Sequence, residues 1–218
     1  MTELRPEVHA WPVDPSDHAQ VAADAARVIR GGGLVVYPTD TVYGLGVDPA
    51  NALAVQRVYE VKGRPDAKAI IWLLADLDDA RAWCHVDERA EELASRFWPG
   101  GLTLVLRRLT PQPGDLATLG VRVPNHPAAL AIIRAVGTAV ATTSANRSGE
   151  PSARTADEAL AQLGTKIDLV VDAGAAPGGT ESTVLDLTVD EPVVLRAGAV
   201  EREAIETVLG IAVRMPGA

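Results

Sequence analysis

The sequence has little that could form a covalent or metal-bound framework. Cys84 is the only cysteine among 218 residues, so neither an intrachain disulfide nor a cysteine-cluster zinc site can form. The four histidines, at positions 9, 18, 85 and 126, show no metal-ligand spacing. A single thiol is typical of a reducing compartment, and we therefore expect a cytoplasmic protein that is held together by its core.

Long apolar runs and basic runs are also missing. No apolar stretch approaches the roughly 18 residues of a membrane span, and the first 15 residues lack the pattern of a signal peptide. The formal net charge is −9 and aromatic residues make up 4%. Because phosphate contacts need Lys and Arg, we expect weak or no direct binding of nucleic acid, and no membrane partner.

What the chain does have is an alternation of short apolar runs with amphipathic stretches. Its hydrophobic content of 47% allows one large core. The pattern predicts a single α/β domain with a twisted mixed sheet flanked by helices, over residues 16–210, between a loose arm at 1–15 and a tail at 211–218. The last two strands are joined by a short turn and should be antiparallel. Strands are expected near 34–36, 69–74, 102–106, 120–124, 139–143, 167–172, 182–187 and 192–196, and helices near 17–30, 51–61, 77–83, 87–98, 127–136, 155–164 and 200–209.

The stretch 37–46 carries the first candidate site. It follows a buried apolar run, and Pro38 ends that strand because proline cannot donate to a ladder. Five polar or amphipathic side chains then fall within seven residues. Ligands of open α/β sheets bind at strand ends, although an ordinary polar turn is the alternative interpretation.

Further polar segments stand at the ends of predicted elements, at 62–64, 144–146 and 181–183, and Arg122 and Arg196 lie in short strands. Gathered at one sheet edge, their basic groups and hydroxyls suit an anionic ligand with several oxygens, such as a nucleoside triphosphate, because arginine offers planar paired donors. The alternative is structural: each arginine pairs with a carboxylate, and Ser-x-Asn caps a helix. The sequence offers no Ser-His-Asp or Cys-His candidate.

Seven segments, taken in order, resemble the motifs of the threonylcarbamoyl-AMP synthase family, in its short single-domain form. They lie at 38–45, 62–65, 98–100, 121–124, 144–149, 181–184 and 195–198. The resemblance covers about residues 18–210. It implies the YrdC-like fold, a twisted sheet around a large positively lined cavity. It also implies an activity: L-threonine, bicarbonate or CO2, and ATP yield threonylcarbamoyl-AMP and pyrophosphate. That product serves the N6-threonylcarbamoyl modification of adenosine 37 of tRNA, through a downstream tRNA threonylcarbamoyl-transferase complex.

The same resemblance implies roles for particular residues. The groups around the reacting atoms would be Lys62, Arg64, Ser144 and Asn146. Threonine contacts would be Thr41, Arg122, Thr142 and Ser182. ATP contacts would be Arg64, Lys68, Thr118, Ser144, Ser152 and Arg196. Mg²⁺ is expected to accompany ATP, and no residue identifies its ligand.

Two positions depart from the family pattern. Lys68 replaces an asparagine, and Leu73 stands where a threonine-contacting histidine is common. Two other interpretations stay open. One is an RNA-binding protein of this fold without synthase activity; the other is a carbamoyl-adenylate transferase domain, as in hydrogenase maturation proteins.

Overall fold

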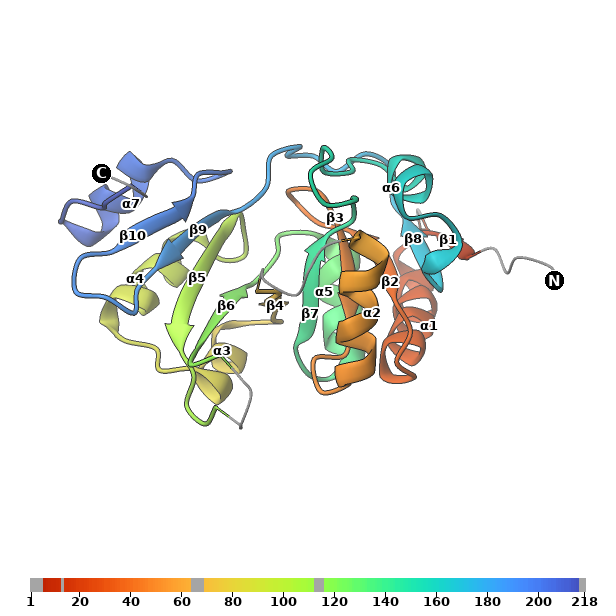
Figure 1. Ribbon diagram of the computed structural model, residues 1–218, viewed down its shortest axis with the longest axis horizontal. Helices are drawn as coiled ribbons and strands as arrows, with labels where there is room; N and C mark the ends of the chain where they lie inside the picture. The colour runs from red at the N-terminus through yellow and green to blue at the C-terminus, as the bar shows by residue number, and fades with distance from the viewer. Residues whose placement is uncertain (1–5, 13, 64–68, 112–115, 216–218) are drawn as a thin grey trace.

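A computed structural model of the chain describes residues 6–12, 14–63, 69–111 and 116–215. Within these ranges ten strands form one mixed sheet, in the order β1-β8-β2-β3-β7-β4-β6-β5-β9-β10 (Figure 1). The strands are β1 (Glu7–Ala10), β2 (Val35–Pro38), β3 (Tyr43–Val47), β4 (Ile71–Leu73), β5 (Leu102–Arg107), β6 (Thr118–Arg122), β7 (Val140–Ser144), β8 (Leu169–Asp172), β9 (Thr183–Asp186) and β10 (Val193–Arg196).

The helices begin where the sequence supplies caps. The side chains of Asn51, Asp76, Asp87 and Thr155 each accept a backbone N–H at the start of a helix, and Pro127 opens another. The helices are α1 (His18–Arg30), α2 (Ala52–Lys62), α3 (Leu77–Trp83), α4 (Glu88–Phe97), α5 (Pro127–Val136), α6 (Ala156–Leu163) and α7 (Arg202–Leu209), with short 3-10 turns at Pro15–Asp17 and Gly164–Lys166. No helix in the described ranges is long and apolar enough to cross a membrane.

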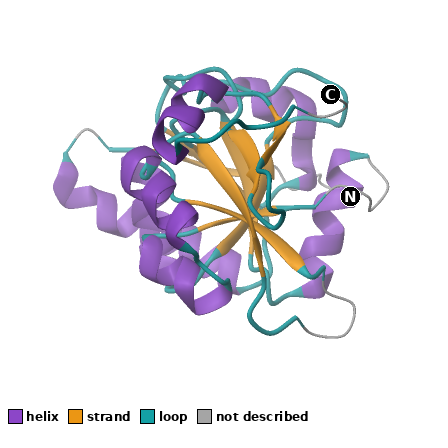
Figure 2. Cartoon of the chain, turned by 90° about the vertical axis from the view of Figure 1, so that its left-hand side faces the viewer, coloured by secondary structure: helices purple, strands orange, loops and turns teal. Residues whose placement is uncertain are grey.

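The apolar faces of the helices form three clusters against the sheet. Buried residues of α2 and α6 pack with β2, β3 and β8 in one cluster, and those of α1 and α5 pack with the same part of the sheet in a second. The third cluster joins α3, α4 and α7 to β5, β6, β9 and β10. Figure 2 shows helices on both sides of the twisted strands. The two halves of the sheet are joined through the three residues of β4.

The predicted α/β class and mixed sheet are confirmed, and β9 and β10 are antiparallel as expected. The stretch 37–46 is more than the ordinary polar turn of the alternative interpretation. Pro38 does end β2, but Tyr43–Val47 forms β3, between β2 and β7. A Cβ on Gly44 would lie 2.7 Å from the Thr142 methyl group, so glycine permits this close pairing.

The ends of the chain also differ from the prediction. Within the expected loose arm, Glu7–Ala10 pairs parallel with β8, and the N–H of Trp11 donates to the carbonyl of Asp172 at 2.6 Å. Within the expected tail, Val213 is buried and Arg214 bridges to Val193. These short segments are held by backbone hydrogen bonds to an edge of the sheet. Such bonds do not depend on a periodic pattern of apolar side chains, so the sequence gives no sign of them.

Candidate active site

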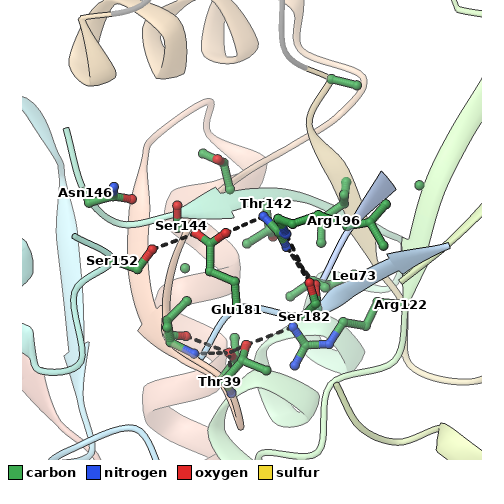
Figure 3. A pocket seen from close by; sticks show the side chains of 18 of the residues that line it. Thr39, Leu73, Arg122, Thr142, Ser144, Asn146, Ser152, Glu181, Ser182 and Arg196 are labelled. Atoms are coloured by element: carbon green, nitrogen blue, oxygen red, sulfur yellow. Dashed lines mark hydrogen bonds and ion pairs between the residues drawn. The ribbon is translucent and has the colours of Figure 1, made fainter. Parts of the chain in front are cut away.

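A cavity of about 630 Å³ opens over the middle of the sheet (Figure 3). Its wall comes from β3, β4, β6, β7 and β10, from the end of α2, from the loops that follow β2 and β7, and from the segment before β9. Every described residue with a predicted role lines it: Thr41, Lys62, Thr118, Arg122, Thr142, Ser144, Asn146, Ser152, Ser182 and Arg196. Arg64 and Lys68 lie outside the described residues.

Arg122, the last residue of β6, forms one corner of the cavity and is 3% exposed. Its Nε donates to the carbonyl of Gly100 at 2.8 Å, Nη1 donates to Thr41 Oγ1 at 2.9 Å, and Nη2 donates to Asp40 Oδ1 at 2.5 Å. Burial lowers the pKa of Arg122, and the carboxylate of Asp40 opposes that shift. These bonds use three of the five guanidinium N–H donors, and described residues leave the other two unused.

The turn that presents Thr41 is held from two sides. Thr39 Oγ1 donates to the carbonyl of Val42 at 2.6 Å and accepts the N–H groups of Thr41 and Val42. From across the cavity rim, the N–H groups of Gly178 and Gly179 donate to the carbonyls of Asp40 and Thr41, at 3.0 and 2.7 Å. The backbone of the turn is therefore held in place, and the hydroxyl of Thr41 hydrogen-bonds Thr39 Oγ1 at 2.9 Å.

Two more buried hydroxyls complete this corner. Thr142 Oγ1 hydrogen-bonds the hydroxyl of Tyr37 at 2.7 Å, and burial raises the pKa of Tyr37, so the phenol stays neutral. Ser182 Oγ hydrogen-bonds Thr103 Oγ1 at 2.8 Å. Leu73, which is 1% exposed and pairs with Arg122 across β4 and β6, adds a hydrocarbon wall.

Lys62, at the end of α2, lies under the loop that follows β7 and is 3% exposed. Its Nζ donates to the carbonyl of Ser144 at 2.5 Å and to Asn146 Oδ1 at 3.3 Å. Asn146 Nδ2 in turn donates to the carbonyl of Glu150 at 2.6 Å. Gly63 ends the helix in a left-handed conformation, with φ of 64°. Three of the four residues predicted around the reacting atoms are therefore in contact.

Glu181 organises the opposite side of the cavity. Its Oε1 accepts the Ser152 hydroxyl at 2.6 Å, and Oε2 pairs with Arg196 Nη1. Arg196 Nη2 also donates to the carbonyl of Ser182 at 2.8 Å. Burial by itself would raise the pKa of Glu181, but the Ser152 hydroxyl and the Arg196 charge outweigh it and hold that pKa below its usual value. The carboxylate is therefore ionised at neutral pH.

Asp40 and Glu181 are two charged residues at the site whose roles no sequence pattern predicts. Both lie inside the candidate segments, next to Thr41 and Ser182, but only the structure shows which arginine each one meets. The described lining carries the basic side chains of Lys62, Arg122 and Arg196 and the acidic ones of Glu150 and Glu181. The predicted positive lining is thus partly balanced by carboxylates in the part that the structure describes.

A family model with the name Sua5_yciO_yrdC, described as "Telomere recombination", matches residues 27–198. The chain belongs to the Sua5/YciO/YrdC family. Among its relatives in this family, the threonylcarbamoyl-AMP synthase of Bacillus subtilis is 41% identical over 92% of this chain and 61% of its own length. The putative threonylcarbamoyl-AMP synthase of Mycobacterium tuberculosis is 37% identical over 91% of this chain and 93% of its own length.

Among solved structures, the crystal structure of P. abyssi Sua5 complexed with L-threonine aligns with a TM-score of 0.87 and 39% identity. The alignment covers 95% of this chain and 62% of that chain. The chain therefore spans about three fifths of the length of P. abyssi Sua5 and of the B. subtilis relative.

Proposed function

We propose that the chain is an L-threonylcarbamoyladenylate synthase, a nucleotidyltransferase that uses ATP. One observation carries the proposal: groups suited to an amino-acid carboxylate and groups suited to a polyphosphate line the same cavity, around Arg122 and Arg196. The names of the relatives and the L-threonine complex of P. abyssi Sua5 support it. The cavity volume of about 630 Å³ is within the usual range for small-molecule sites.

The threonine end is assigned to the Arg122 corner. Two N–H donors of this guanidinium are not used by described residues, and a carboxylate accepts a pair of such donors well. Thr41, Thr142 and Ser182 supply hydroxyls around the same corner. In this arrangement the carboxylate is anchored at Arg122, and the amine of the amino acid faces the middle of the cavity.

The ATP end is assigned to the opposite side, where Arg196, Ser152 and Ser144 offer donors and Lys62 adds positive charge. Each hydrogen bond to a charged group contributes about 1.5–3 kcal/mol. Thr118, at the start of β6, lines the cavity as well and is assigned to the nucleotide. We assign Arg64 and Lys68 to ATP as well, as the family resemblance implies.

The reaction requires positioning more than a reactive side chain. The threonine amine adds to the carbon of CO2 and loses a proton, which gives a carbamate. Starting from bicarbonate, the amine proton and a hydroxide leave together as water. A carbamate oxygen then attacks the α-phosphorus, and the bond to the pyrophosphate oxygen breaks. The two reactants are anions that repel each other, so the fixed charges of Lys62, Arg122 and Arg196 stabilise their approach and the charge that develops.

Mg²⁺ bound with ATP would neutralise phosphate charge. In the described ranges no three His, Cys, Asp or Glu side chains are grouped as a metal site. An ion held mainly by phosphate oxygens and water needs no such group. We further propose that the product is used in the cytoplasm by a tRNA threonylcarbamoyl-transferase complex.

The test is to incubate the protein with ATP, Mg²⁺ and labelled bicarbonate, with threonine, with serine or with neither. Pyrophosphate release that requires threonine, together with label in an adenylate, supports the proposal. Release that is indifferent to the amino acid would refute it. Release that requires carbamoyl phosphate would favour a carbamoyl-adenylate transferase, and tight binding of RNA with a steep salt dependence would favour the RNA-binding interpretation.

A further inference from the structure

Glu181 has the surroundings of a bound anion. A hydroxyl from Ser152 and a guanidinium from Arg196 hold its two carboxylate oxygens, and the Ser144 hydroxyl and the Lys62 charge also favour the ionised form. Figure 3 shows the carboxylate directed toward Ser152 on one side and toward Arg196 on the other. These four partners are the same groups that we assign to the phosphates of ATP, so a phosphate oxygen and the Glu181 carboxylate compete for them.

The competition is unequal for small and large anions. The Glu181 carboxylate is attached to the chain, so it occupies its partners without the translational entropy that a free anion loses on binding. Inorganic phosphate or bicarbonate could make only contacts of the kind that Glu181 already makes. A triphosphate brings further charged oxygens to Lys62 and to the rest of the cavity, and this additional binding energy offsets the displacement of the carboxylate.

We propose that Glu181 is a resident anion that raises the threshold for anion binding, so that small anions stay out of the phosphate subsite while a polyphosphate still binds. This rests on the proposed function, in which the subsite takes ATP. A synthase that consumes bicarbonate must work in the presence of bicarbonate, yet bicarbonate must not fill its phosphate subsite. The Glu181 carboxylate would keep bicarbonate out of that subsite. Glu181 is thus a positioning residue for Arg196 and Ser152.

The test is direct binding of inorganic phosphate, measured by calorimetry on wild-type protein and on Glu181→Gln, which removes the charge and keeps the shape. We expect the Kd for phosphate to fall at least tenfold in the variant, which corresponds to about 1.4 kcal/mol. The Kd for pyrophosphate should fall by a similar factor, because that ligand also displaces the carboxylate. Bicarbonate, tested as a competitor of pyrophosphate, should compete more strongly in the variant.

The matched control is Glu150→Gln. Glu150 lines the same cavity, and its change to glutamine removes one negative charge, as Glu181→Gln does. Its side chain is exposed, and in the part of the chain that the structure describes no hydrogen bond or ion pair joins it to Arg196 or Ser152. Its Kd for phosphate should stay within twofold of wild type. If Glu181→Gln does not fold, as judged by its thermal midpoint, Glu181→Ala serves in its place with the same expectation.

Three results would overturn the inference: a phosphate Kd within twofold of wild type in the Glu181 variant, an equal gain in Glu150→Gln, or weaker binding in the Glu181 variant. The last would mean that the carboxylate helps Arg196 to bind anions. Calorimetry with phosphate needs no threonine and no turnover, so it is independent of the synthase assay. If phosphate binds as expected but the synthase assay fails, only the proposed function is refuted. A threonine-dependent synthase with unchanged phosphate binding would refute this inference alone.

Discussion

The guanidinium of Arg122 has N–H donors that point in several directions, and a lysine side chain cannot reproduce this arrangement. Its three nitrogens reach Gly100, Thr41 and Asp40, whereas a lysine ammonium is a single point of charge. We predict that Arg122→Lys raises the KM for threonine at least tenfold, because one charged hydrogen bond of about 1.5–3 kcal/mol is lost. The KM for ATP should change less than threefold. Steady-state kinetics with each substrate varied in turn measures both values.

Lysine is chosen at this position because Arg122→Ala would take away the guanidinium that pairs with the partly buried carboxylate of Asp40, and loss of one partner of a buried pair destabilises the fold. The control is Arg134→Lys, an exposed position on α5 outside the cavity lining, where both KM values should be those of wild type. An equal rise in the two KM values of Arg122→Lys would contradict the assignment of this corner to threonine.

At the residue scale, the sequence predicted which polar side chains gather but not how they pair. The described residues with a predicted role all line one cavity, because their segments stand within or at the ends of predicted strands and helices. The pairs Arg122–Asp40 and Arg196–Glu181 were not predictable. They depend on which strands are neighbours and on how loops return across the sheet, and neither leaves a local pattern.

Among the elements, the loop after β8 supports the turn that carries Thr41. The N–H groups of Gly178 and Gly179 bond to that turn, and a Cβ on Gly178 would lie 2.5 Å from the carbonyl oxygen of Asp40. We predict that Gly178→Ala destabilises the fold by about 1–3 kcal/mol, as overpacking does, and raises the Kd for threonine severalfold because Thr41 is displaced. Urea unfolding and threonine binding by calorimetry check the two parts.

The control for this substitution is Gly31→Ala, at the end of α1, where the nearest atom to the added Cβ is a carbonyl oxygen at 3.3 Å. It should destabilise less than Gly178→Ala and leave threonine binding unchanged. Wild-type threonine affinity in a destabilised Gly178→Ala would show that the loop supports only the fold and not the site.

Strand β3 is tied to the loop after β8 by Tyr43, whose hydroxyl donates to the carbonyl of Gly174 at 2.7 Å. Burial raises the pKa of Tyr43 to about 12. The phenol of the unfolded chain ionises near pH 10, so the stability that it contributes is complete below pH 10 and is lost as the pH rises toward 12. We predict a shallower fall in the free energy of unfolding between pH 10 and 12 in Tyr43→Phe, measured by urea titration at each pH. Equal slopes in the two proteins would contradict it.

The elements themselves were predictable where local signals agree. The helix predicted at 127–136 has the observed bounds, because Pro127 and Gly137 mark its two ends. Strands β1 and β3 were missed. Tyr43–Val47 contains two glycines, which disfavour a strand, and it is extended because β2 and β7 pair with it on both sides.

For the whole molecule, the cavity is lined from both halves of the sheet, so a ligand bound there stabilises the complete fold. At a concentration 100 times its Kd, a ligand adds about 2.7 kcal/mol to the free energy of unfolding. In a chain of this size each kcal/mol raises the midpoint by about 2–4 °C, so we predict a rise of about 5–10 °C with saturating ATP, measured by differential scanning fluorimetry. Adding threonine should raise it further in wild type but not in Arg122→Lys. A midpoint that ATP leaves unchanged would count against a nucleotide site in this cavity.

The two edges of the sheet are β1 and β10, at opposite ends of the molecule (Figure 1). All the other strands stand between them, so small rotations of neighbouring strands around a bound ligand add up along the row. The distance between two fluorescent labels, one on each edge, would therefore change by more than the distance between two neighbouring strands. Energy transfer between the labels would then report how the sheet responds as each substrate fills its end of the cavity.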